Sequence, residues 1–74
     1  MIKVEFLGPM SEFQPLEIQA QTLQELKENL HNDAKIRQWL QISAIAVNDE
    51  IIEDLSYPLK KGDKVVVLPP VCGG

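Results

Sequence analysis

The sequence predicts an α+β domain in which a mixed sheet carries one main helix on one face. Two alternating apolar segments open the chain, a capped amphipathic segment begins at Thr22, and a run of valines lies near the C-terminal end. The chain of 74 residues suits one domain. A domain this small buries only about 60% of the surface that its unfolded chain exposes.

Composition and charge exclude several classes of function. Apolar residues make up 45% of the chain and charged residues 24%, which is typical of a globular domain. The net charge is −4 and no basic cluster extends beyond Lys60 and Lys61, so neither nucleic acid nor an anionic membrane is an expected partner. An acidic domain is suited to basic protein surfaces.

The sequence also predicts a cytoplasmic protein. Its first residues alternate like a strand, and the apolar run 65–72 contains prolines and is far shorter than the ~20 residues of a membrane-spanning helix. The single cysteine, Cys72, allows no internal disulfide and agrees with a reducing compartment. Whether Cys72 is a small spacer or a reactive thiol is left open by the residues.

Two alternating segments predict an antiparallel hairpin at the start of the chain. Segment 2–6 has apolar side chains on one face and ends at Gly8-Pro9. Leu7 is apolar although it falls on the polar side. Segment 16–20 repeats the alternation and is expected to return antiparallel to the first.

A capping box predicts the start of the main helix. The Thr22 hydroxyl is placed to accept an N–H of the first turn, while Glu25 reaches back to the cap. An apolar stripe with helical spacing follows, at Leu23, Leu26 and Leu30. Segment 31–33 ends this helix, and 34–40 suggests a shorter helical segment that closes the core.

The second half of the chain predicts the remaining strands. Residues 44–47 form a strand that Asn48-Asp49 turns into a short extended piece at 51–52. Gly62 allows a tight turn before the last strand, 64–68, whose three consecutive valines are typical of a central strand. The simplest fold for this order is the β-grasp, or ubiquitin-like, architecture. We expect it to cover residues 1–68, with a flexible tail at 69–74.

The side chains offer no catalytic set of nucleophile, base and charge-stabilising group. His31 is the only histidine and is expected at a solvated helix end. The carboxylates of 49–54 lack the spacing of a calcium loop and are expected in turns. No bound metal or cofactor is expected.

The C-terminal end is the candidate functional group. Pro69 and Pro70 fix φ and remove two backbone donors, which stops the last strand and stiffens the chain after it. Gly73 and Gly74 lack Cβ atoms, so such an end can enter a narrow channel. The Gly74 carboxylate is ionised at neutral pH and needs activation by another protein, for which an acyl-adenylate made from ATP is the expected form. A frayed terminus is the simpler alternative.

Residues 59–74 resemble the C-terminal signature of the molybdopterin synthase small subunit, in which L-x-x-G-D-x-V precedes a hydrophobic pair, P-P and a terminal G-G. The chain carries this signature as LKKGDKVVVLPPVCGG. The MIKV opening, the Thr-Leu helix start and Val47-Asn48 followed by an acidic residue also resemble that family. The resemblance therefore covers the whole chain.

This resemblance implies a sulfur carrier. An adenylating enzyme related to ubiquitin activators would use ATP to form the acyl-AMP of Gly74, and a sulfurtransferase would convert it to a thiocarboxylate. The tail with Gly73 and Gly74 would then enter the large synthase subunit and give sulfur to cyclic pyranopterin monophosphate, which becomes molybdopterin. The implied assembly is a heterotetramer of two small and two large subunits, and the small subunit binds no cofactor.

The family also implies partner-binding residues in this chain: Leu7, Ile51, Leu68, Pro69 and Pro70. Leu7 is a candidate on independent grounds, as an apolar residue on a polar strand face. Where family members often have an Arg-Glu pair, this chain has Ser11-Glu12, so a contact of that arginine is not carried over.

Three other functions stay open at this point. A thiamine-pathway sulfur carrier shares the fold, the activation and the Gly-Gly end, but its relatives usually lack the Pro-Pro pair. A ubiquitin-like modifier would be joined through Gly74 to lysines of other proteins. A plain interaction module would use a face of the sheet and not its tail.

Overall fold

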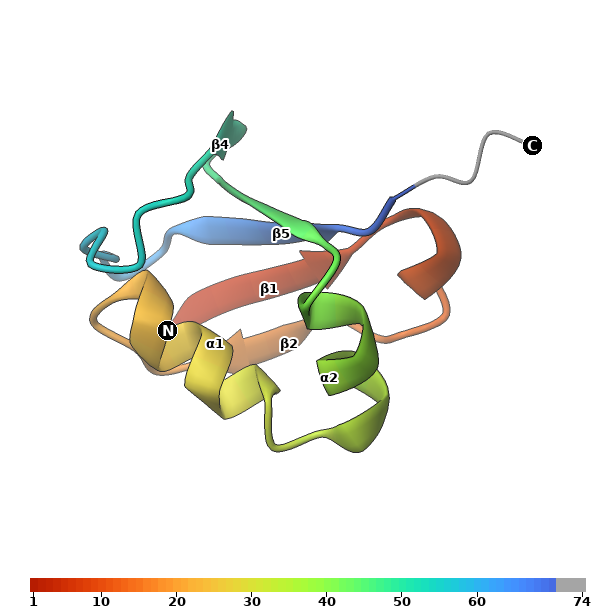
Figure 1. The fold of residues 1–74 in the computed structure, drawn as a ribbon. Helices are drawn as coiled ribbons and strands as arrows, with labels where there is room; N and C mark the ends of the chain where they lie inside the picture. Colours follow the sequence, from red (N-terminus) through yellow and green to blue (C-terminus); the bar gives the residue numbers. More distant parts are fainter. Residues whose placement is uncertain (71–74) are drawn as a thin grey trace.

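The computed structural model describes residues 1–70 of the chain (Figure 1). The strands are β1 (Ile2–Phe6), β2 (Leu16–Ile18), β3 (Ala44–Val47), β4 (Glu50–Ile51) and β5 (Lys64–Leu68). The helices are α1 (Leu23–Leu30) and α2 (Ala34–Leu40), and a 3-10 turn, η1, spans Gly8–Met10. Each predicted element is present, but β2 ends two residues before the predicted 20, and β4 spans 50–51 where 51–52 was predicted.

The five strands form one mixed sheet in the order β2-β1-β5-β3-β4. Strand β1 pairs antiparallel with β2 and parallel with β5, and β3 pairs antiparallel with both β5 and β4. Figure 1 shows both helices on the same side of this sheet. The predicted mixed sheet with helical cover on one face is confirmed.

Strand β5 lies at the centre of the sheet, between β1 and β3. Its three valines point alternately to the two faces, as in any strand. Val65 and Val67 belong to the core under the helices and are fully buried, whereas Val66 is 8% exposed and lies outside that core cluster. The run of valines therefore marks the central strand of the sheet, as predicted.

The cap of α1 explains where this helix begins. The backbone N–H of Glu25 donates to Oγ1 of Thr22 over 3.2 Å, and Leu23, Leu26 and Leu30 are buried. No hydrogen bond of residues 1–70 joins the Glu25 carboxylate to the Thr22 N–H, so the reciprocal half of the predicted capping box is not formed. Thr22 alone caps the helix.

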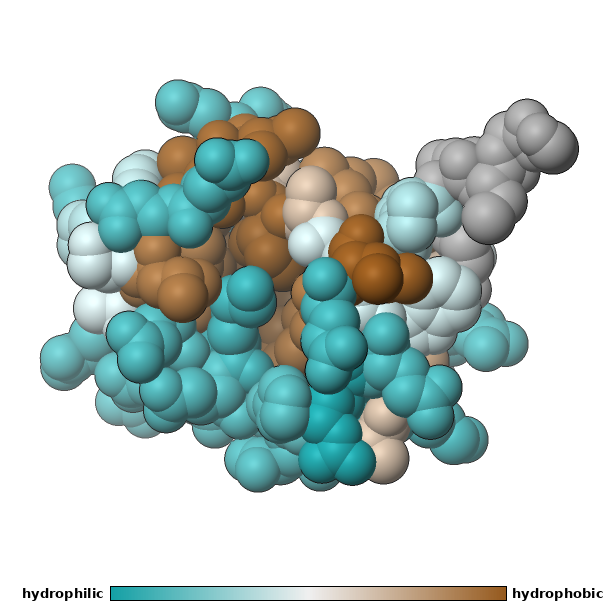
Figure 2. Space-filling view, in the orientation of Figure 1, coloured by the Kyte–Doolittle hydropathy of each residue, from teal (hydrophilic) through white to brown (hydrophobic). Residues whose placement is uncertain are grey.

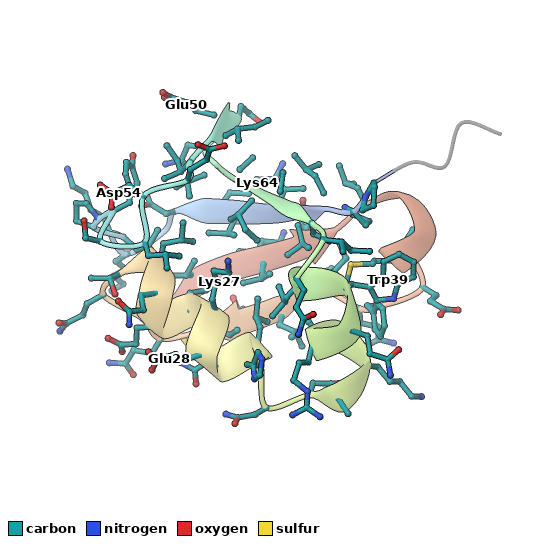
Figure 3. The ribbon with its side chains drawn as sticks, in the orientation of Figure 1. Lys27, Glu28, Trp39, Glu50, Asp54 and Lys64 are labelled. Carbon is teal, nitrogen blue, oxygen red and sulfur yellow. The ribbon has the colours of Figure 1, made fainter. Side chains whose placement is uncertain are left out.

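The cap of α2 is an aspartate. Asp33 accepts from the N–H groups of Lys35 and Ile36 over 2.9 and 3.3 Å. Ile36 and Leu40 are buried, and Trp39 is half-buried and packs against the core from α2 (Figure 3). The shorter helix closes one end of the core, as the sequence predicts.

Three positions with positive φ form the tight turns around the short strand and the last strand. Asn48 and Asp49, at φ 50° and 71°, connect β3 to β4 in a two-residue hairpin turn, and positive φ at both positions is typical of the type I′ turn. Gly62, at φ 91°, precedes β5. These are the residues that the sequence assigns to turns.

Pro69 is buried and lies beside Gly8 of the turn η1, whereas Pro70 is exposed. Among residues 1–70, neither helix is long and apolar enough to cross a membrane.

Candidate functional site

Three residues predicted to bind a partner lie around one hollow of about 410 Å³. Leu7 follows β1, Ile51 lies in β4, and Leu68 ends β5. The hollow is lined by Glu5, Leu7, Ala46, Asp49, Ile51, Lys64, Val66 and Leu68. The fold thus brings together residues that are far apart in the sequence.

Strand register explains why these residues share one face. Glu5 of β1 is opposite Val66 of β5, Val66 is opposite Ala46 of β3, and Ala46 is opposite Ile51 of β4. Directly opposite residues in neighbouring strands point to the same side of a sheet. Since the valines on either side of Val66 face the helices, this row faces away from them.

The hollow has exposed apolar side chains on either side of a buried apolar floor. Leu7 is 49% exposed and Ile51 60% exposed, while Leu68 is half-buried. Val66 and Ala46 form a buried floor between them. Exposed apolar side chains gathered on one face mark an interaction surface.

Charged residues border this surface. Glu5 lies 3.5 Å from Nζ of Lys64 on β5 and 3.7 Å from Nζ of Lys3 on its own strand. Such exposed ion pairs contribute only about 0 to 1 kcal/mol to stability. An apolar centre with a charged border is the usual composition of a protein interface, where the charges favour one orientation of the partner.

Sequence reasoning missed the floor and the border of this surface. Val66 is the middle residue of three valines, so alternation required it to face away from the other two. Glu5 lies two residues before Leu7 and therefore on the same strand face. Lys64 lies two residues before Val66 in β5, so alternation places it on the same face as well. Ala46 carried no such signal, because its position depends on pairing between distant strands.

The tail residues of the predicted site are described only in part. Pro69 is buried and Pro70 exposed. Gly73 and Gly74, and with them Cys72, lie outside the described residues. The tail starts directly after Leu68, which ends β5 and lines the apolar surface.

The acidic residues around β4 do not converge on a metal site. Within residues 1–70, no group of three or more potential ligands is close enough to hold a metal ion. Glu50 and Asp54 lie apart on the outer side of the molecule (Figure 3). The O–H and N–H groups of Ser56 both donate to Asp54 and lower its pKa, so Asp54 acts as a turn residue.

A second hollow of about 400 Å³ opens between α1 and the β3–β4 hairpin. Figure 2 shows apolar surface here, bordered by the hydrophilic side chains of the helices. Its apolar lining includes Leu23, Ile42, Ile45, Ile52 and Leu55, and Ile51 lines both hollows. No histidine or cysteine of the described residues lines it, so it offers no candidate nucleophile or base of that kind.

The apolar surface and the C-terminal signature together suggest a carrier, and comparison with known proteins decides the family. A model described as the ThiS family matches residues 4–74. The chain belongs to the ThiS family. It is thus a ubiquitin-like sulfur carrier, and the predicted carrier class is confirmed at this level.

Among solved structures, the ThiS-family chain is similar to a chain in the complex of subunits 1 and 2 of molybdopterin-converting factor from Helicobacter pylori. The identity is 42%, the match covers 99% of this chain and 97% of that chain, and the TM-score is 0.88. The resemblance to the small subunit of molybdopterin synthase and the predicted β-grasp fold are both confirmed.

Two more distant structures share the fold of this ThiS-family chain. A chain of the BexX/CysO complex from Amycolatopsis orientalis is 22% identical, with 100% of each chain covered and a TM-score of 0.79. SAMP1 from Haloferax volcanii is 15% identical, with 99% and 98% covered and a TM-score of 0.73. A search of curated protein sequences gives no significant match.

Proposed function

We propose that this chain is the sulfur-carrying small subunit of a molybdopterin synthase. The observation that supports this most directly is its 42% identity, over nearly its whole length, to a chain in a complex of the two subunits of molybdopterin-converting factor. The Pro-Pro and Gly-Gly ending, which also fits that family, points the same way.

The reacting group in this proposal is the main-chain carboxylate of Gly74. A carboxylate is a poor electrophile, so a partner enzyme first joins it to AMP from ATP, with loss of pyrophosphate. A sulfurtransferase then supplies sulfur at the oxidation level of sulfide, which displaces AMP and leaves a thiocarboxylate. This sulfur is a better nucleophile than the oxygen that it replaces, and it attacks cyclic pyranopterin monophosphate. Water then cleaves the bond between the sulfur and the carbonyl carbon of Gly74, so the sulfur stays on the pterin and the carboxylate is restored. No side chain of the carrier has to take part.

The apolar surface around Leu7, Ile51 and Leu68 is the proposed docking site for the large subunit. It lies next to the base of the tail, so one partner can cover this surface while the tail enters its active site. The large subunit then provides the charge stabilisation and the water exclusion that the carrier lacks. Two such pairs would form the heterotetramer.

Intact-mass measurement of the carrier from its native host tests the sulfur-carrier step. We expect a species that is heavier by the difference between sulfur and oxygen, and we expect it to disappear when Gly74 is deleted. Absence of this species from wild-type protein under conditions of cofactor synthesis would falsify the proposal.

A second measurement separates the pathways. The thiocarboxylated protein is mixed with the large synthase subunit and cyclic pyranopterin monophosphate, and the loss of the extra mass is followed. Sulfur loss that depends on both additions supports molybdopterin synthesis. Sulfur loss that requires thiamine-pathway enzymes instead would identify the thiamine carrier, and covalent attachment to lysines would identify a modifier.

A further inference from the structure

We propose that the turn after β1 holds Pro69 and so fixes the direction in which the chain leaves the sheet. In this proposal Gly8 and Pro69 are positioning residues for the C-terminal tail. The two prolines of the tail then have different roles, because only the first is packed against the domain.

Hydrogen bonds within the turn after β1, and two of its side chains that pack into the core, hold this turn in place. The backbone N–H groups of Met10, Ser11 and Phe13 donate to the carbonyls of Leu7, Gly8 and Met10 over 3.2, 2.9 and 3.0 Å. The Met10 side chain is fully buried. Phe13 packs against Phe6 of β1, with ring centroids 5.7 Å apart. A turn anchored in this way can support another segment without moving.

The same turn is connected to the end of β5. The N–H of Leu7 donates to the carbonyl of Val67 over 3.2 Å, which extends the pairing of β1 and β5 past the end of β1. Beyond it, a methyl group built on Gly8 would lie 3.8 Å from Cγ of Pro69. Figure 1 shows the red turn η1 lying beside the blue end of β5.

Gly8 has the backbone conformation that this arrangement needs. Its φ is 60°, a left-handed conformation that glycine adopts without cost and that other residues disfavour. This φ lets the chain turn sharply after Leu7, so that η1 lies against the start of the tail and not along the strand direction.

Burial of Pro69 gives the tail a defined starting direction. Its ring fixes φ near −65°, and its burial beside Gly8 holds the ring relative to the sheet. A tail that starts in one direction has fewer conformations to lose when it enters the channel of a partner, so it reaches productive geometry more often. Pro70 is exposed and stiffens the chain without this contact.

The consequence for sulfur loading rests on the proposed function and is tested with two matched variants. Pro69→Ala and Pro70→Ala make the same chemical change at neighbouring positions, one buried and one exposed. We expect Pro69→Ala to raise the KM of the adenylating enzyme for the carrier about tenfold with little change in kcat, and Pro70→Ala to raise this KM by a clearly smaller factor. Equal effects would mean that chain stiffness alone matters and would overturn the inference.

Two controls keep loss of folding separate from loss of positioning. The urea midpoint of each variant is measured, and KM is compared under conditions where all variants are fully folded. Pro69→Val keeps a buried apolar side chain without the ring, so we expect a KM between those of Pro69→Ala and the wild type. If Pro69→Ala lowers the midpoint but leaves KM unchanged, Pro69 is only a packing residue.

A label on Cys72, the only cysteine, gives a readout that does not depend on sulfur chemistry. The anisotropy decay of a fluorophore at this position measures the angular range of the tail in the free carrier. We expect a wider range in Pro69→Ala than in Pro70→Ala. If wild-type protein never carries sulfur but the label shows this difference, the proposed function fails and the positioning of the tail stands. If sulfur loading is normal but the label shows no difference between the variants, the positioning fails alone.

Discussion

Asn48 and Asp63 join two turns that lie side by side where β5 begins. Nδ2 of Asn48 donates to Oδ1 of Asp63 over 3.1 Å, and Oδ1 of Asn48 accepts from the N–H of Lys64 over 3.1 Å. The other oxygen of Asp63 accepts from the N–H of Lys60 over 2.8 Å. One pair of side chains thus fixes the β3–β4 turn against the turn that leads into β5.

Replacing Asn48 tests this link. Asn48→Gly removes the side-chain hydrogen bonds but tolerates the φ of 50°, so we expect a loss of about 1 kcal/mol in the free energy of unfolding. Asn48→Ala should lose about 1 kcal/mol more, because alanine disfavours the left-handed conformation. Urea denaturation measures both. A Gly variant as stable as the wild type would show that the hydrogen bonds do not stabilise the fold.

Asp63 makes stability depend on pH. The N–H of Lys60 and the amide of Asn48 donate to its carboxylate and lower its pKa below 3.8 in the folded protein. The unfolded chain therefore binds a proton more readily, so this stabilisation is complete above the unfolded pKa and is lost as pH falls through the lower, folded pKa. We expect Asp63→Asn to lose less stability than the wild type between about pH 5 and pH 3. Urea midpoints measure this stability at each pH. If the wild type and Asp63→Asn lose the same stability as pH falls, Asp63 is not the group responsible.

Gly62 has a purely conformational role at its turn. Its φ is 91°, and a Cβ atom placed there would meet no atom within 4 Å. Gly62→Ala should therefore lower the free energy of unfolding by about 1 kcal/mol or somewhat more through backbone strain alone. For a domain of this size that is a fall of about 4 to 8 °C in Tm. The Tm of Gly62→Asn should fall less, because asparagine tolerates positive φ better than alanine does. An unchanged Tm in Gly62→Ala would exclude strain at this turn.

Leu7 tests the proposed docking surface. It is 49% exposed, so Leu7→Asp should leave the fold intact while it places a charge at the apolar centre. We expect at least about 30-fold weaker binding to the large synthase subunit, measured by calorimetry, because central apolar residues often contribute about 2 kcal/mol or more. Leu16→Asp is the matched control, since Leu16 is 38% exposed on the edge strand β2 and does not line the surface. Equal weakening by both variants would place the interface elsewhere.

The last prediction concerns the carboxylate of Gly74 as the site of activation. Adding one alanine after Gly74 moves the carboxylate away from the position that the activating enzyme must reach, while the packed domain stays the same. We expect complete loss of thiocarboxylate in the mass spectrum and an unchanged urea midpoint. A carrier that still gains sulfur with the extra residue would contradict activation at Gly74.

Much of the fold could be predicted because local signals agreed with it. Alternation in 2–6 and helical spacing from Leu23 to Leu30 each place apolar side chains on one side of a single element, and the capping threonine fixes where α1 begins. The Gly-Gly ending is visible in the sequence alone. The reciprocal bond of Glu25 failed because a side chain at the surface can be solvated instead.

Sequence alone therefore determined the elements, their buried faces and the C-terminal signature, since these depend on neighbours within a few residues. Tertiary structure decided the rest. Leu7, Ile51 and Leu68 share one surface because β1, β5, β3 and β4 pair in one register. Pro69 lies beside Gly8 because the end of β1 stays paired with the end of β5. Such contacts join segments that are distant along the chain, and the period of a single segment carries no information about the partner against which it packs.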